Sequence, residues 1–148
     1  MHFTTLFILK GEKLEDYSKE EIEDIFCERF CYCCGETKPK YLYWCDWFQI
    51  GGRWGDLLKA KKGIHCDRGW SNDNAPIVPG EFAVAQISEL TEPLPRNRIY
   101  SVATKSQIIL KSEDWTVGKV DEEKFNKILD DIDNKKFEGI VALIDCHD

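Results

Sequence analysis

The residues best suited to acid–base chemistry stand together at positions 145–147. Asp145, Cys146 and His147 directly follow an apolar run over residues 140–144. Because side chains alternate along a strand, we expect Asp145 and His147 to share one face and Cys146 to point to the other. An aspartate that orients a histidine is a common acid–base arrangement, and histidine titrates near neutral pH. Asp145 and His147 are therefore the predicted catalytic residues, and the alternative is an exposed His147 without a role.

A second group combines aromatic rings, glycines and a guanidinium: Asp46, Trp47, Gly51, Gly52, Arg53 and Trp54. The glycines can adopt positive φ and let the backbone approach another surface. Arg53 offers a planar fork of donors for phosphate or carboxylate, and either tryptophan can stack on a ring. The segment predicts a pocket for a small anionic ligand with a ring. The alternative is a tight bend in which Arg53 pairs with Asp46 and the tryptophans belong to the core.

A third group consists of cysteines, five of the seven lying between residues 27 and 45. Their odd number favours reduced thiols or metal ligation over a complete set of disulfides. A CxxCG pattern over residues 31–35 could supply two thiolates to one zinc ion. The predicted ligands are Cys31, Cys34, Cys45 and Cys66, with His65 as an alternative to Cys66, and Cys27 adds a spare thiol. The other interpretation is that the cysteines are small buried hydrophobic residues.

The composition excludes several classes of protein. With 27 acidic and 20 basic side chains, the net charge of −7 disfavours binding to nucleic acid or to an anionic membrane surface. The longest apolar runs are too short for a membrane-spanning helix, and residues 3–9 are better interpreted as a strand than as a signal peptide, so we expect a cytosolic protein. The motifs GxxxxGK[ST], GxSxG, HExxH and GxGxxG are absent from the sequence.

Two amphipathic helices are expected to support these groups. Ser18 and Glu21 form a capping box, after which apolar residues keep helical spacing over residues 19–30. Asp121 is a suitable N-cap for a second helix. Its apolar stripe consists of Phe125, Ile128, Leu129 and Ile132.

Runs of apolar and β-branched residues predict the strands. They are expected at residues 3–9, 41–50, 81–90, 98–103, 107–111 and 140–146. The pair 98–103 and 107–111 should form an antiparallel hairpin. Residues 56–60 could begin a short helix, and the polar residues 61–80, with their glycines and prolines, predict a long excursion.

The order of these elements predicts the fold class. A chain of 148 residues suits a single domain, here residues 1–148. We expect an α+β protein with an antiparallel sheet and two helices packed on one face. The simplest such arrangement is ferredoxin-like, a split βαβ fold, with residues 61–80 as a long inserted loop.

Two stretches resemble a known family. Residues 44–54 read Trp-Cys-Asp-Trp-Phe-Gln-Ile-Gly-Gly-Arg-Trp, and residues 141–147 read Val-Ala-Leu-Ile-Asp-Cys-His. They are similar to a family of small uncharacterised proteins of bacteria and their phages, whose members carry an aromatic-Asp-Trp-aromatic-x-x-Gly-Gly-Arg-Trp stretch and end in a strand closing with Asp-Cys-His. The resemblance implies no reaction. It implies that Asp46, Arg53, Trp54, Asp145 and His147 converge in space.

These observations leave several hypotheses of function. The first is a protein that binds a small anionic ligand through Arg53 and the tryptophans, and that could be a phosphoryl-directed hydrolase or transferase using His147. The second is a protein that binds a partner without catalysis, such as a phage-encoded inhibitor of a host protein, through residues 61–80 or an open sheet edge. The third is a structural module stabilised by zinc. Whether the protein is an enzyme stays open at this point.

Overall fold

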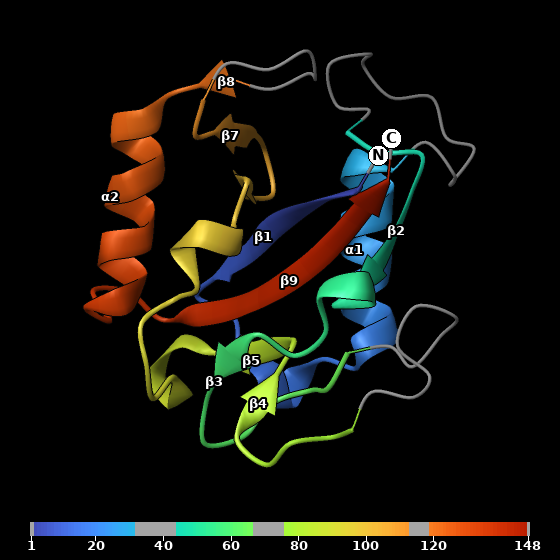
Figure 1. Ribbon diagram of the computed structural model, residues 1–148, viewed down its shortest axis with the longest axis vertical. Helices are drawn as coiled ribbons and strands as arrows, with labels where there is room; N and C mark the ends of the chain where they lie inside the picture. Colours follow the sequence, from blue (N-terminus) through green and yellow to red (C-terminus); the bar gives the residue numbers. More distant parts are fainter. Residues whose placement is uncertain (1, 32–43, 67–75, 113–118, 148) are drawn as a thin grey trace.

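The computed structural model describes residues 2–31, 44–66, 76–112 and 119–147, and a large sheet runs through its centre (Figure 1). The strand order is β2 (Trp47–Ile50), β9 (Gly139–His147), β1 (His2–Lys10), β6 (Ser101–Ala103), β7 (Ile108–Leu110) and β8 (Lys119–Val120). A further strand, β5 (Val84–Gln86), also pairs with β9, and β3 (Leu58–Lys59) pairs with β4 (Glu81–Phe82) in a small separate sheet. Together with two α-helices, this confirms the α+β class.

The sheet is mixed, so the expectation of a purely antiparallel sheet is wrong. β1 and β9 form a nine-residue antiparallel ladder, whereas β1 pairs with β6, and β7 with β8, in parallel. Parallel neighbours need a long crossover. The chain provides one, since it passes through α1 (Lys19–Phe30) and β2 to β5 before it returns as β6. The ferredoxin-like topology is not confirmed.

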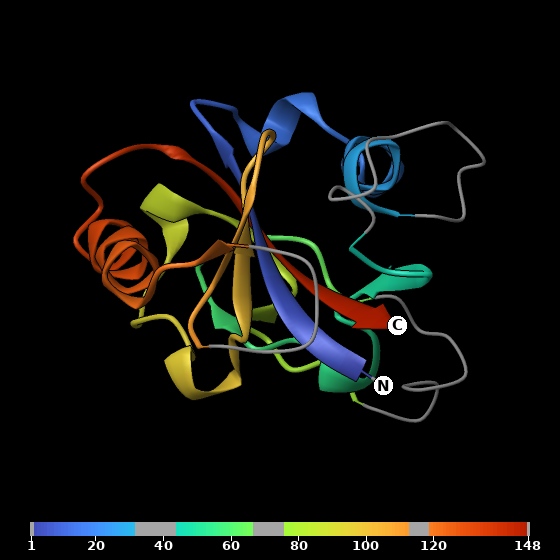
Figure 2. The ribbon, with the colours of Figure 1, turned by 90° about the horizontal axis from the view of Figure 1, so that it is seen from above.

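The two helices lie on opposite faces of the sheet (Figure 2). α1 buries Ile22, Phe26 and Phe30 in the cluster that contains Phe3 and Phe7 of β1. α2 (Glu122–Asp133) buries its apolar stripe in a second cluster with the even-numbered residues of β1: Phe125, Leu129, Ile132, Leu6 and Ile8. The prediction that both helices share one face is therefore wrong. Because β1 and β9 are apolar on both faces, each face needs its own cover.

The local signals in the sequence correspond to the observed elements. Ser18 accepts a hydrogen bond from the amide of Glu21, whose carboxylate accepts one from the amide of Ser18, so the capping box is confirmed. Asp121 caps α2 by accepting from the amide of Lys124 at 3.0 Å. β6 and β7 form the predicted antiparallel hairpin.

The middle of the chain differs from the prediction. Residues 56–60 contain the short strand β3 instead of the start of a helix, because Leu58 is buried and pairs with Phe82 of β4. Of the predicted long excursion, residues 67–75 lie outside the described residues, and Ile64 forms a bridge with Val84. Three-residue 3-10 helices connect the strands: η1 (Leu14–Asp16), η4 (Gly52–Trp54), η5 (Ile87–Glu89) and η6 (Arg96–Arg98). Among the described helices, none has the length and apolar character needed to cross a membrane.

Both helix faces should contribute to one cooperative unfolding transition. Phe26 and Phe125 are each fully packed on opposite faces of the same strands. We expect Phe26→Ala and Phe125→Ala each to lower the free energy of unfolding by about 3–5 kcal/mol, because each leaves a large cavity. Urea denaturation followed by circular dichroism measures this loss. Glu28→Ala, at an exposed position of α1, is the control and should change little; a variant that loses one helix while the other stays folded would contradict a shared core.

Candidate functional site

The end of β9 brings together residues from three strands. His147 lies between His2 of β1 and Trp47 of β2 in the two ladders. Asp145, two positions earlier, is on the same face of the strand as His147, while Cys146 belongs to the core under α1 on the other face. This is the alternation predicted from the sequence.

Asp145 is the most constrained polar residue of this region. Its side chain has no exposed surface. One carboxylate oxygen accepts a hydrogen bond from Nδ1 of His2 at 2.8 Å, and the other accepts one from the backbone amide of Arg53 at 2.8 Å. Hydrogen bonds to a charged acceptor contribute about 1.5–3 kcal/mol each. The histidine that Asp145 orients is therefore His2, and not His147 as the sequence pattern suggested.

Two further aromatic rings lie beside the pair of His2 and Asp145. The imidazole of His147 stacks on the indole of Trp47, with centroids 5.0 Å apart and planes 12° apart. His2 stands edge-on to both rings, 5.1 Å from His147 and 5.4 Å from Trp47. Nδ1 of His147 faces Oδ2 of Asp46 at 4.0 Å. We call His2, Asp46, Trp47, Asp145 and His147 the histidine centre.

Each imidazole of the centre thus turns Nδ1 toward a carboxylate. His2 is 11% exposed and held directly by Asp145, whereas His147 is 33% exposed and faces the more open Asp46. No hydrogen bond to Nε2 of His2 or of His147 is found within the described residues. Nδ1 of His2 is hydrogen-bonded and Nδ1 of His147 is only near a carboxylate, and in each ring Nε2 lies on the opposite side, where it is available to a further molecule.

Several buried polar atoms near Asp145 have no hydrogen-bond partner in the described part of the chain. They are Oε1 of Gln49, Nε1 of Trp54 and Nδ1 of His147. Gln49 is opposite Asp145 in the β2–β9 ladder, and Trp54 belongs to η4, whose first turn donates to Asp145. A buried polar atom without a partner costs about 1–3 kcal/mol. Such atoms mark a place where a bound molecule would gain polar contacts.

The glycines of the predicted pocket have an internal role. Gly51 and Gly52 both adopt positive φ, +71° and +49°, as the sequence suggested. A Cβ on Gly52 would overlap the carboxylate of Asp145, and one on Gly51 would overlap Cβ of Cys66. Gly52 therefore allows η4 to approach β9 closely, which brings the Arg53 amide to Asp145, and Gly51 allows the approach to Cys66.

The guanidinium of Arg53 extends from this point toward solvent. Arg53 is exposed, and only its backbone amide bonds to the centre. The alternative ion pair with Asp46 is not formed; Asp46 faces His147 instead. Of the two tryptophans, Trp47 takes part in the ring cluster, and Trp54 is half-buried in η4.

The cysteines form a thiol cluster on the other face of β9. Cys31 and Cys45 are free thiols that face each other in a backbone β-bridge, and Sγ of Cys45 donates to the carbonyl of Phe30 at 3.9 Å. The neighbouring thiols of Cys146 and Cys31, together with burial, raise the pKa of Cys45 above its ordinary value. Cys66 lies under Gly51, and Cys27 is disulfide-bonded, so it is not a spare thiol.

A zinc site is not visible in this part of the molecule. Across residues 2–31, 44–66, 76–112 and 119–147, no three His, Cys, Asp or Glu side chains are grouped so that they could hold a metal ion. Cys34, one of the predicted ligands, lies outside the described residues. The zinc site stays a prediction.

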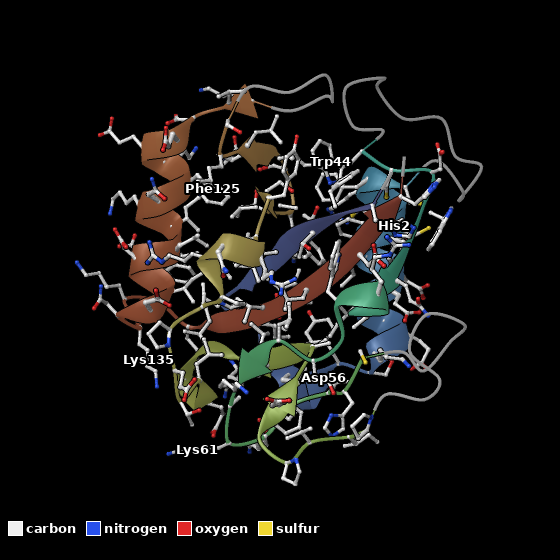
Figure 3. The ribbon with its side chains drawn as sticks, in the orientation of Figure 1. His2, Trp44, Asp56, Lys61, Phe125 and Lys135 are labelled. Atoms are coloured by element: carbon white, nitrogen blue, oxygen red, sulfur yellow. The ribbon has the colours of Figure 1, made fainter. Side chains whose placement is uncertain are left out.

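A second aspartate–histidine pair was missed by the sequence analysis. Nδ1 of His65 lies 2.9 Å from Oδ2 of Asp56, whose other oxygen accepts from the amide of Cys66. The His65 ring stacks on Phe82 of β4. Figure 3 shows Asp56 near β3, well separated from His2. This pair ties residues 65–66 to the small sheet and provides a comparison for the histidine centre.

His2 itself was also missed, because the sequence indicates only the face of β1 on which it lies. His2 begins β1 and, like Leu6 and Ile8, is an even-numbered residue of this strand, so it lies on the same face as they do. Only the pairing of β1 with β9 places it beside Asp145.

Comparison of the chain with protein-family models, with curated proteins and with solved structures finds no significant match. The resemblance described above stays a prediction.

The contact between η4 and Asp145 can be tested through Gly52. A positive φ costs an L-residue about 1–2 kcal/mol. Gly52→Ala should lower the free energy of unfolding by more than this, because the new Cβ also displaces the Asp145 carboxylate. Gly11→Ala is the matched control, since Gly11 has φ +81° but open space around it. Urea denaturation of both variants gives the comparison, and equal losses would contradict the close contact.

Proposed function

We propose that the protein binds a small phosphate ester at the histidine centre and hydrolyses it by acid–base catalysis. The observation that carries this proposal is the hydrogen bond between Nδ1 of His2 and the fully buried Asp145. A carboxylate in this position fixes the tautomer and orientation of the ring and stabilises the imidazolium form. His2 can then exchange a proton through Nε2.

His147 supplies the second proton-transfer group. Its ring lies 5.1 Å from that of His2 and also turns Nδ1 toward a carboxylate, that of Asp46. Hydrolysis of a phosphate diester needs one base and one acid. One imidazole takes a proton from water as the water oxygen bonds to phosphorus, and the other gives a proton to the leaving oxygen as its bond to phosphorus breaks.

Arg53 and Trp54 are the residues best suited to hold the substrate. The Arg53 guanidinium starts from the backbone position that bonds to Asp145, extends into solvent and offers paired donors to phosphate oxygens. The unpartnered Nε1 of Trp54 could donate to the same anion. In this proposal Arg53 and the imidazolium balance the negative charge of the ligand, while both oxygens of Asp145 already accept hydrogen bonds within the protein.

The catalytic role of His2 is tested with bis(p-nitrophenyl) phosphate. We expect His2→Asn to lower kcat/KM by about 100- to 10,000-fold, the usual contribution of a general acid or base. Release of p-nitrophenolate measures the rate. His65→Asn, which removes the imidazole of the other aspartate–histidine pair, is the matched control and should keep the rate. Arg53→Lys should raise KM more than it lowers kcat, since the ammonium group of lysine is a point charge and lacks the paired donors of the guanidinium. Equal rates for His2→Asn and the unmodified protein would contradict the proposal.

A second candidate function is the binding of a partner protein. It is favoured by Ile77 and Val78, whose side chains are 59% and 40% exposed next to each other in the predicted excursion. Exposed apolar neighbours often mark contact surfaces. The partner would be a host protein if the chain derives from a phage, one of the two sources that the family resemblance covers.

This second candidate predicts a partner that depends on those two side chains. Immobilised protein should capture a host protein that the double variant Ile77→Ser, Val78→Ser does not capture, and quantitative mass spectrometry of the two samples gives the difference. Equal recovery by both proteins would count against a contact through these residues.

A further inference from the structure

The molecule has a groove at the end of β1 opposite to the histidine centre. It lies between α2 and the turn that joins β6 to β7, and its volume is about 410 Å³. His2 begins β1 and Lys10, which lines the groove, ends it. At about 3.3 Å per residue, the two places are roughly 26 Å apart along the strand. The groove is therefore separate from the proposed active site.

The floor of the groove is apolar. It is formed by Ile8 of β1, Ile128 of α2 and the ring of Phe137. Ile8 is buried, while Ile128 and Phe137 are partly exposed and pack against the edge of the α2 core. Partly exposed apolar side chains in a concave surface can contact the hydrocarbon part of a ligand.

Three lysines line the groove: Lys10, Lys105 and Lys124. Nζ of Lys10 lies 5.0 Å from the centre of the Phe137 ring, a cation–π contact that keeps it over the floor. Nζ of Lys105 has one weak ion pair, 3.7 Å from Glu12. No ion pair of Lys124 is found in the described part of the chain.

Among the residues that the structure describes, one carboxylate lines the groove, and it is already engaged. Asp131 accepts from Nζ of Lys127, one helical turn earlier on α2, at 3.1 Å. The hydroxyls of Thr104 and Ser106 and the amide of Gln107 add neutral polar groups at the turn. On a chain of net charge −7, the groove is thus a local concentration of positive charge.

Another cavity, of about 530 Å³, does not have this character. Its lining combines Lys13 and Lys62 with three glutamates, Glu15, Glu89 and Glu138. The amide of Gln86 at its side already donates to the carbonyl of Glu12 and accepts from the amide of Leu14. Its charges therefore favour no particular ligand.

We propose that the groove between α2 and the β6–β7 turn binds a small organic anion in which a phosphate or phosphonate group is attached to a ring. The ring lies on Ile8, Ile128 and Phe137, and the anionic group lies among the ammonium groups of Lys10, Lys105 and Lys124. The volume is sufficient for a ring with one such group.

Phenylphosphonate is a suitable probe, because its carbon–phosphorus bond is not an ester that the histidine centre could hydrolyse. Titration followed by amide chemical shifts should give saturable changes at residues 104–107 and at Lys124. Inorganic phosphate, which lacks the ring, and phenol, which lacks the charge, should each bind at least tenfold more weakly. Changes confined to the histidine centre, or no saturable change at residues 104–107, would overturn the proposal.

A pair of charge-matched variants tests the role of the lysines. The double variant Lys105→Glu, Lys124→Glu should weaken phenylphosphonate binding at least tenfold. The control Lys61→Glu, Lys111→Glu changes the net charge equally at exposed positions that do not line the groove, Lys61 lying near β3 and β4 (Figure 3). A wide spread of amide chemical shifts, as in the unmodified protein, shows that each variant is folded. Equal weakening by both pairs would mean that the net charge alone attracts the anion, and would overturn a specific site.

The two proposals fail independently. If His2→Asn loses hydrolysis and the phenylphosphonate shifts at residues 104–107 are unchanged, both proposals are supported. If the shifts at residues 104–107 disappear in His2→Asn, the probe binds at the histidine centre and the proposed groove site is overturned.

Discussion

The antiparallel pairing of β1 with β9 is the interaction on which the rest of the structure depends. These strands are the first and last in the described chain, and their ladder runs from His2 opposite His147 to Lys10 opposite Gly139. Each then holds further strands, β2 and β5 on β9 and β6 on β1. Because both strands are apolar on both faces, their register also decides which side chains meet α1 and which meet α2.

Elements with a local signal could be predicted from the sequence. The capping box of Ser18, the N-cap Asp121 and the hairpin of β6 and β7 all depend on residues within a few positions of each other. The arrangement of those elements could not. Whether α1 and α2 cover one face or two depends on strand pairing across the whole chain, and so does the short strand β3, whose partner is more than twenty residues away.

The same distinction explains what was predicted of the candidate site. Strand alternation was enough to place Asp145 and His147 on one face, and the two glycines indicated the tight turn that η4 makes. The partner of Asp145 was not predictable, because His2 is 143 residues away in sequence and becomes a neighbour only through the ladder. A histidine without a local motif gives no signal of its own. The position of Arg53 was predicted correctly as close to Asp145, but it is the backbone amide that makes the contact.

The central position of β9 affects how the protein is made. β9 follows every other described strand in the chain and contacts β1, β2 and β5. During translation, β1 and α1 leave the ribosome while the strand that should cover one edge of β1 has not yet been synthesised. The nascent chain therefore exposes an apolar strand edge until the segment containing Asp145 emerges, a state in which chaperones commonly bind and in which aggregation competes with folding.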